Sequence, residues 1–167
     1  MDIYLNNDYK NSLKVVSVVG FPLGANTTEI KRLEAQEAVK NGASELDMVI
    51  NQGLFKIGEY DKVIEDINAV CQAGVLVKVI IETSQLNQQE IAKLCELVNQ
   101  SNATYIKTST GFVGEGARVE DIVLMRKLMN KNKFVKASGG IRDKETFLKM
   151  IQAGADRIGT SSGIKLI

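Results

Sequence analysis

The sequence predicts an α/β protein with a parallel sheet, and more specifically an incomplete (β/α)₈ barrel. Apolar, β-branched runs alternate with amphipathic segments along the 167 residues, which is typical of parallel strands joined by helices. The predicted strands begin near positions 15, 45, 75, 104, 134 and 157, and this interval of about 30 residues suits one strand and one helix per unit. Polar residues recur at the carboxyl end of nearly every strand, where barrel enzymes form their active sites. An open doubly wound sheet also fits the alternation, but it would concentrate such residues at one point.

The first unit combines a β-branched strand with a capped helix. Residues 15–19 form an uncharged run that ends in Gly20–Gly24, a turn rich in glycine and proline. Asn26 or Thr27 can cap the helix expected at 28–40, because its apolar residues have broadly helical spacing.

The second and third units follow the same rhythm. A strand is expected at 45–51, before a helix at 60–73 that Gly74 ends. Residues 75–82 are almost continuously apolar apart from Lys78, as expected for a strand covered on both faces.

The rest of the chain repeats this alternation to its end. Further strands are expected at 104–108, 134–137 and 157–160. Further helices are expected at 88–100, 119–129 and 144–153.

The chain is short for the predicted fold, because barrels usually need about 200 to 250 residues. Six strands are clear and Ile3–Leu5 is a weaker seventh. We therefore expect that the first strand–helix unit is missing and that the last helix is cut short. Long linkers and low-complexity tracts are absent, so residues 1–167 are expected to form a single barrel domain.

Composition excludes several function classes. The formal net charge is +1 without a basic run, so nucleic-acid binding has no electrostatic footprint. No apolar stretch approaches the roughly 18 residues of a membrane span. The amino terminus lacks the features of a signal peptide, and Cys71 and Cys95 form no CxxC pair, so a reducing, cytoplasmic location is expected. The absence of histidine excludes Ser-His-Asp and Cys-His catalytic units and argues against zinc. We expect neither a metal nor a cofactor.

Two lysines occupy the same kind of position at the ends of strands. Lys107 lies within Tyr105–Gly111 and Lys136 within Phe134–Gly140, and each precedes small hydroxyl residues and glycine. Such a turn lets a ligand approach the backbone closely. Both could instead be lysines that extend to solvent from the strand ends, but the repetition favours an active site.

Alternation along the strands predicts that several charged side chains share the barrel interior. Lys107, Lys136 and Asp47 would face inward there, and Lys78 and Glu82 would share one face of their strand. A structural ion-pair network is the simpler alternative to an active site. If the two lysines lie on neighbouring strands, their ammonium groups repel and one loses its proton more easily. A neutral lysine is a nucleophile for a carbonyl carbon, and Asp47 would be a general base or the anchor of a proton-relaying water.

Two loops rich in glycine and serine follow the last two strands, at 138–142 and 159–163. Barrels often bind phosphate with the loops after strands seven and eight, using exposed backbone N–H groups. The candidate substrate- and phosphate-binding residues are Gly111, Gly139, Gly140, Arg142, Gly159, Ser161 and Ser162.

Six motifs resemble the deoxyribose-phosphate aldolase family, whose members are class I, Schiff-base aldolases with a (β/α)₈ fold. They occur in the family's order, as Val18–Gly24, Glu45–Asn51, Lys78–Thr83, Ile106–Phe112, Val135–Arg142 and Gly159–Gly163. The resemblance implies that Lys107 forms the Schiff base, that Lys136 lowers the pKa of Lys107 and that Asp47 belongs to a proton relay. It also implies that the Gly139–Gly140 and Ser161–Ser162 loops hold the substrate phosphate.

The implied activity (EC 4.1.2.4) is the reversible cleavage of 2-deoxy-D-ribose 5-phosphate to D-glyceraldehyde 3-phosphate and acetaldehyde. The chain departs from the family in one respect, because the family's first strand carries an Asp-His-Thr type motif and this sequence has no histidine. Two alternatives therefore stay open: a Schiff-base aldolase of another sugar phosphate, or an inactive protein that binds a phosphorylated ligand or acts only through assembly. A barrel without its first strand exposes sheet edges, so we expect a homo-oligomer.

Overall fold

The computed structural model describes residues 13–166, except for the side chain of Lys165. Within that range the sheet strands are β1 (Val16–Val19), β2 (Glu45–Val49), β3 (Leu76–Ile80), β4 (Tyr105–Lys107), β5 (Phe134–Ser138) and β6 (Arg157–Gly159). The α-helices are α1 (Thr28–Lys40), α2 (Gln52–Lys56), α3 (Tyr60–Cys71), α4 (Gln88–Gln100), α5 (Val119–Leu128) and α6 (Lys144–Gln152). Two 3₁₀ turns are η2 (Thr83–Gln85) and η3 (Gly163–Lys165). The predicted strand Ile3–Leu5 lies outside the described residues.

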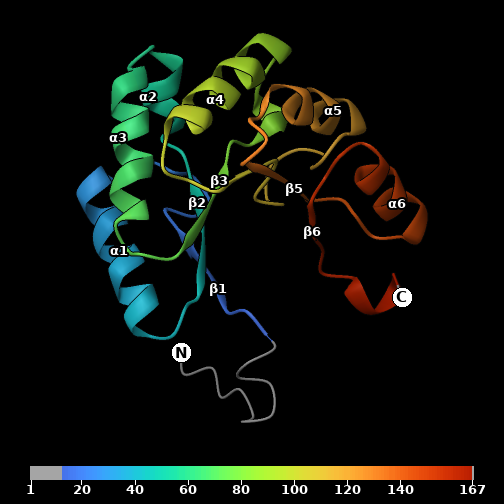
Figure 1. Cartoon of the computed structure of the whole chain (residues 1–167), viewed down its shortest axis with the longest axis horizontal. Helices are drawn as coiled ribbons and strands as arrows, with labels where there is room; N and C mark the ends of the chain where they lie inside the picture. Colours follow the sequence, from blue (N-terminus) through green and yellow to red (C-terminus); the bar gives the residue numbers. More distant parts are fainter. Residues whose placement is uncertain (1–12, 167) are drawn as a thin grey trace.

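The described strands form one parallel sheet in the order β1-β2-β3-β4-β5-β6. The helices follow an arc on the outer side of this curved sheet, from α1 and α3 through α4 to α5 and α6 (Figure 1). This is an incomplete barrel, a half-barrel that is open between β1 and β6, and it confirms the predicted fold class. Among residues 13–166, no helix combines the length and apolarity needed to cross a membrane.

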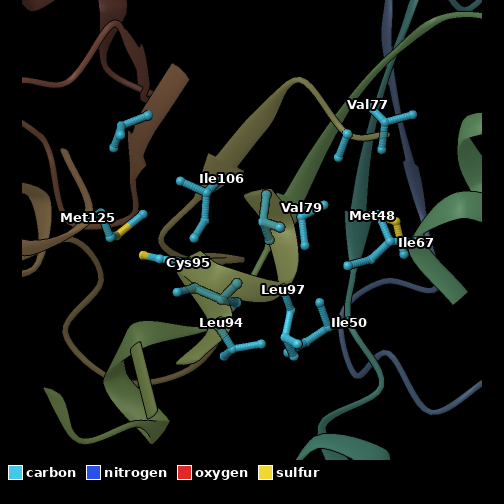
Figure 2. Packing of buried hydrophobic residues seen from close by; sticks show 14 of the residues in the cluster. Met48, Ile50, Ile67, Val77, Val79, Leu94, Cys95, Leu97, Ile106 and Met125 are labelled. Carbon is cyan, nitrogen blue, oxygen red and sulfur yellow. The ribbon is translucent and has the colours of Figure 1, made fainter. Parts of the chain in front are cut away.

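The apolar core lies between the sheet and its helices rather than inside the barrel. Because side chains alternate across a strand, every second residue of β2, β3 and β4 faces the helices. Met48, Val79 and Ile106 thus belong to one apolar cluster with Leu94 and Leu97 of α4, part of which Figure 2 shows. All five side chains are buried, so burial of apolar surface holds the helices on this face.

Side-chain caps fix where several helices begin. Thr27, rather than Asn26, caps α1 by accepting a hydrogen bond from the backbone N–H of Ile30. Asn87 and Glu90 form a reciprocal capping box at the start of α4. The sequence analysis missed the short helix α2, which begins after Asn51. Its five residues are too few for helical periodicity, and Gly53 within it obscured the signal.

Candidate active site

The concave face of the sheet is as polar as its outer face is apolar. The side chains that alternate with the core residues bring two carboxylates and four cations to this face, and these belong to Glu45, Asp47, Lys78, Lys107, Lys136 and Arg157. The parallel register brings neighbours into line, because Asp47 is the partner of Lys78 and Lys107 is the partner of Lys136. The predicted sharing of one face is therefore confirmed.

Asp47 is the centre of one part of this cluster. Its Oδ2 accepts hydrogen bonds from Lys107 Nζ at 2.8 Å and from Lys136 Nζ at 2.7 Å. Its Oδ1 lies 3.1 Å from Lys78 Nζ. Burial alone would raise the pKa of Asp47, but the charges of Lys107 and Lys136 outweigh burial and hold that pKa at about 2. Asp47 is therefore an anionic anchor at neutral pH and only a weak base.

The surroundings of Lys136 lower the pKa of this lysine. Burial lowers the pKa of this lysine, Asp47 opposes that change, and the neighbouring charge of Lys107 lowers the pKa further. The net direction is downward from the ordinary value. A buried pair of lysines thus shares one carboxylate oxygen, which makes release of a proton from the pair easier.

Glu45 is the centre of the other part of the cluster, which is a structural ion-pair network. Glu45 Oε2 lies 2.6 Å from Lys78 Nζ and also pairs with Arg157. Burial raises the pKa of Glu45, and its bonds to Lys78 and Arg157 more than reverse that effect. The guanidinium of Arg157 lies 5.2 Å from the centre of the Tyr105 ring. Glu45, Lys78 and Arg157 thus fit the structural interpretation of the charged interior. The active-site interpretation of Asp47, Lys107 and Lys136 stays a prediction.

A cavity of about 340 Å³ opens beside Lys107 at the carboxyl ends of β4, β5 and β6. It is lined by Lys107, Thr110, Gly111, Ser138, Gly139, Gly140, Ile141, Arg142, Gly159, Thr160 and Ser161. Most of the predicted site residues thus border one space. Ser162 is not among the lining residues, and its backbone N–H donates to Thr160 Oγ1. Asp47 and Lys136 do not line the cavity. Asp47 accepts hydrogen bonds from both Lys136 and Lys107, and Lys107 lines the cavity.

Close packing of glycines shapes the wall of the cavity. Gly139 and Gly140 have φ angles of 84° and 76°, in the left-handed region that favours glycine. A Cβ atom on Gly116 would lie 2.4 Å from the carbonyl carbon of Gly139, so a side chain there would displace the loop. Thr108 and Ser138 fasten the loop to β4, because each exchanges a hydrogen bond with the other.

The sequence analysis missed four lining residues, Thr110, Ser138, Ile141 and Thr160. All four lie inside the turn segments that flank the nominated residues, so the segments were found but the individual side chains were not chosen. Glu82 was also missed as a site residue, although alternation from Lys78 had placed it on the inner face. Its carboxylate accepts a hydrogen bond from the hydroxyl of Thr110 at 2.5 Å.

Comparison with known proteins agrees with the fold. Residues 5–165 match the family model described as DeoC/LacD family aldolase. The chain is 55% identical over 158 residues to a deoxyribose-phosphate aldolase from Mannheimia succiniciproducens, with 93% of this chain and 70% of the relative covered.

Two solved structures extend the comparison to the fold. The aldolase QR15 superposes with a TM-score of 0.89 at 49% identity, covering 92% of this chain and 71% of that one. A deoxyribose phosphate aldolase from Aeropyrum pernix, described as having a unique tetrameric structure, gives a TM-score of 0.83 at 33% identity, covering 95% and 70%.

Proposed function

Because this chain belongs to the DeoC/LacD family of aldolases, we propose that it reversibly cleaves 2-deoxy-D-ribose 5-phosphate through a Schiff base on Lys107. The products are D-glyceraldehyde 3-phosphate and acetaldehyde. The observation that carries the proposal is that Lys107 lines the cavity while its Nζ shares Asp47 Oδ2 with Lys136. The similarity to deoxyribose-phosphate aldolases over about 70% of their length supports the choice of substrate.

The first half of the reaction forms the electron sink. Lys107 in its neutral form attacks the aldehyde carbon of the open-chain sugar, and loss of water from the adduct gives an iminium ion. Lys136 lies beside Lys107 and shares Asp47 Oδ2 with it, and a neutral lysine amine is a nucleophile for a carbonyl carbon. Asp47 stays anionic and stabilises the positive iminium that replaces the ammonium group.

The second half breaks the carbon–carbon bond and returns the enzyme. A base removes the proton of the C3 hydroxyl, the C2–C3 electron pair moves to the iminium, and D-glyceraldehyde 3-phosphate leaves an enamine on Lys107. Protonation of the enamine carbon and hydrolysis by water release acetaldehyde and the free amine. Since a carboxylate with a pKa of about 2 is a weak base, we assign the proton transfers to a water that Asp47 and Lys136 orient.

The phosphate group is assigned to the part of the cavity that the two glycine-rich loops line. Gly139, Gly140 and Arg142 lie there, with Gly159 and Ser161 on the adjacent loop. Backbone N–H groups in left-handed glycine turns and a guanidinium are suitable partners for a phosphate. The strands carry four cations against two carboxylates on the concave face. At the cavity, Arg142 offsets the further carboxylate of Glu82, so the excess of positive charge favours an anionic substrate.

Trapping with acetaldehyde and borohydride tests the proposal. Borohydride reduces the iminium to a stable secondary amine, so peptide mapping should find an ethyl group on Lys107. Lys133 is the matched control, because it is also a buried lysine but lies at the opposite end of β5 and donates to the carbonyls of Ser101 and Ala103. No adduct on Lys107, or equal labelling of Lys133, would rule out the proposed chemistry.

Turnover measurements then define the substrate. The Lys107→Met variant should lose turnover of 2-deoxy-D-ribose 5-phosphate while it keeps its affinity for inorganic phosphate. A panel of deoxy and hydroxylated sugar phosphates separates this substrate from the alternatives. Preference for a ketose phosphate would indicate another aldolase, and phosphate binding without any adduct would indicate an inactive binding protein.

A further inference from the structure

We propose that Glu82 is a positioning residue that fixes the segment Lys107–Gly111 against the cavity; this inference rests on the function proposed for Lys107. Glu82 follows the end of β3 and precedes η2, so it lies beside the end of β4. Its side chain is buried, with 4% of the residue exposed.

The backbone of Glu82 adopts a conformation that side chains disfavour. Its φ and ψ angles are 54° and 65°, and it is the sole non-glycine residue with positive φ among residues 13–166. Glycine would adopt this conformation without steric strain. Strained backbone of this kind concentrates at sites where a side chain has to be aimed, so the carboxylate is the feature to explain.

The left-handed turn places the Glu82 carboxylate where the next acceptor of the β3–β4 ladder would be. Beyond the strand ends, the backbone N–H of Ile81 donates to the carbonyl of Lys107, and that of Thr83 donates to the carbonyl of Thr108. The N–H of Thr110 is the next donor, and it points at both carboxylate oxygens of Glu82 at 3.3 and 3.2 Å. The Thr110 hydroxyl donates to the same carboxylate at 2.5 Å. The side chain of Glu82 thus extends the pairing by one step.

The opposite side of the same segment is fastened to β5. The N–H of Thr108 donates to the carbonyl of Lys136, and the hydroxyl of Ser138 donates to the carbonyl of Ser109 at 2.7 Å. Glu82 completes this arrangement on the β3 side. It also occupies the N–H and hydroxyl donors of Thr110, which lines the cavity. The phosphate is then left with the donors of the Gly139–Arg142 loop, so the substrate aldehyde faces Lys107.

Amide hydrogen exchange tests the positioning directly and needs no turnover. In the Glu82→Ala and Glu82→Gly variants, the Thr110 amide should exchange at least tenfold faster than in the wild type, while the Thr108 amide should not change. Glu82→Gln keeps an oxygen acceptor and should retain most of the protection. Comparison of Glu82→Ala with Glu82→Gly separates the two features, because both remove the carboxylate and only Glu82→Gly also relieves the strained backbone. Unchanged protection of Thr110 in Glu82→Gly would overturn the proposal.

Kinetics show whether the positioning matters for the reaction. Small displacements of catalytic groups lower rates by up to about 100-fold, so Glu82→Ala and Glu82→Gly should lower kcat about 10- to 100-fold. The affinity for inorganic phosphate should not fall, because both substitutions remove a negative charge beside the cavity and free the donors of Thr110. Glu90→Gln is the control, since Glu90 also accepts from a backbone N–H but caps α4, and its kcat should equal that of the wild type.

The possible failures are distinguishable. A wild-type enzyme without an acetaldehyde adduct would refute the function of Lys107, and the exchange data would still decide the contact with Thr110. A wild-type enzyme that turns over normally, with Glu82→Gly variants of equal kcat, would refute only the role of Glu82.

Discussion

Lys107 and Lys136 are register partners on β4 and β5, and both donate a hydrogen bond to one oxygen atom, Asp47 Oδ2. Two buried cations on a single carboxylate leave an excess of positive charge, and proton release by one lysine relieves it. The contact therefore links the stability of the sheet to the proposed reactivity of Lys107.

The first prediction concerns Lys136. Lys136→Met removes a cation that donates to the same carboxylate oxygen as Lys107, so Asp47 pairs with Lys107 without a competitor. We expect kcat/KM to fall at least tenfold, because small displacements of groups at the reacting amine lower rates by up to about 100-fold. Lys136→Arg keeps the charge and should lower kcat/KM less. An identical kcat/KM in wild type and Lys136→Met, measured over a range of pH, would contradict the assigned role.

The second prediction is a loss of stability in acid that depends on Asp47. The folded state holds the pKa of Asp47 at about 2, below its ordinary value of 3.8, so the unfolded state binds more protons between these values. Stability from this group is thus present above about pH 4 and is lost as the pH falls toward 2. The expected loss is about 2 kcal/mol, measured by denaturant unfolding at a series of pH values. Asp47→Asn should abolish this component of the pH dependence.

The third prediction concerns the buried ion pair between Lys31 of α1 and Asp66 of α3. Lys31 Nζ donates to Asp66 at 2.5 Å and to the carbonyl of Val49 at 3.0 Å, and both side chains are buried. Lys31→Met leaves a buried carboxylate unpaired and should destabilise the protein by about 3 to 5 kcal/mol. The double variant Lys31→Met with Asp66→Leu should recover most of this loss. Lys149→Met removes an exposed pair with Glu145 and should cost no more than about 0.5 kcal/mol. Equal effects of the two lysine substitutions would contradict the prediction.

The fourth prediction separates two effects of adding a side chain to a glycine with positive φ. One is collision with neighbouring atoms, and the other is strain in the backbone. Gly116 and Gly74 both have positive φ, at 86° and 78°. A Cβ atom on Gly116 would collide with Gly139, whereas one on Gly74 would meet no atom within 4 Å. Gly116→Ala should therefore weaken the binding of inorganic phosphate at least tenfold. Gly74→Ala should leave binding unchanged and cost about 1 kcal/mol of stability. Calorimetric titration and thermal unfolding measure the two effects, and normal binding by Gly116→Ala would exclude the assigned loop.

The fifth prediction concerns assembly. Val16 and Val18 point to the concave side of β1, and each is 41% exposed at the open side of the half-barrel. An apolar terminal strand readily pairs with another chain, so we propose that the protein forms a homo-oligomer. The average mass from light scattering should rise with concentration, and Val16→Lys should lower it. Val123→Lys on α5 is the control, because Val123 is similarly exposed but lies away from the open side. A monomer at all micromolar concentrations would refute self-association.

Much of the fold follows from the sequence alone. Strand and helix positions agree to within a few residues, because β-branched runs, helical spacing and glycine stops are local signals. The pairing of Lys107 with Lys136 was also accessible, since each lysine stands at the same phase before its turn and consecutive strands are neighbours in a parallel sheet. The two loops that line the cavity were also predicted from local signals, because glycine and serine indicate turns after β5 and β6.

Contacts across several strands were decided by the tertiary structure. In a flat sheet with strands about 4.8 Å apart, β2 and β5 would lie about 14 Å from each other. The 2.7 Å contact between Asp47 and Lys136 therefore requires the curvature of the half-barrel. Curvature also brings Arg157 of β6 to Glu45 of β2. The sequence period determines which face a side chain occupies, but the closure of the sheet determines which side chains on that face meet. Glu82 shows the same limit locally, because alternation placed it on the inner face and only the left-handed turn after β3 directed its carboxylate to Thr110.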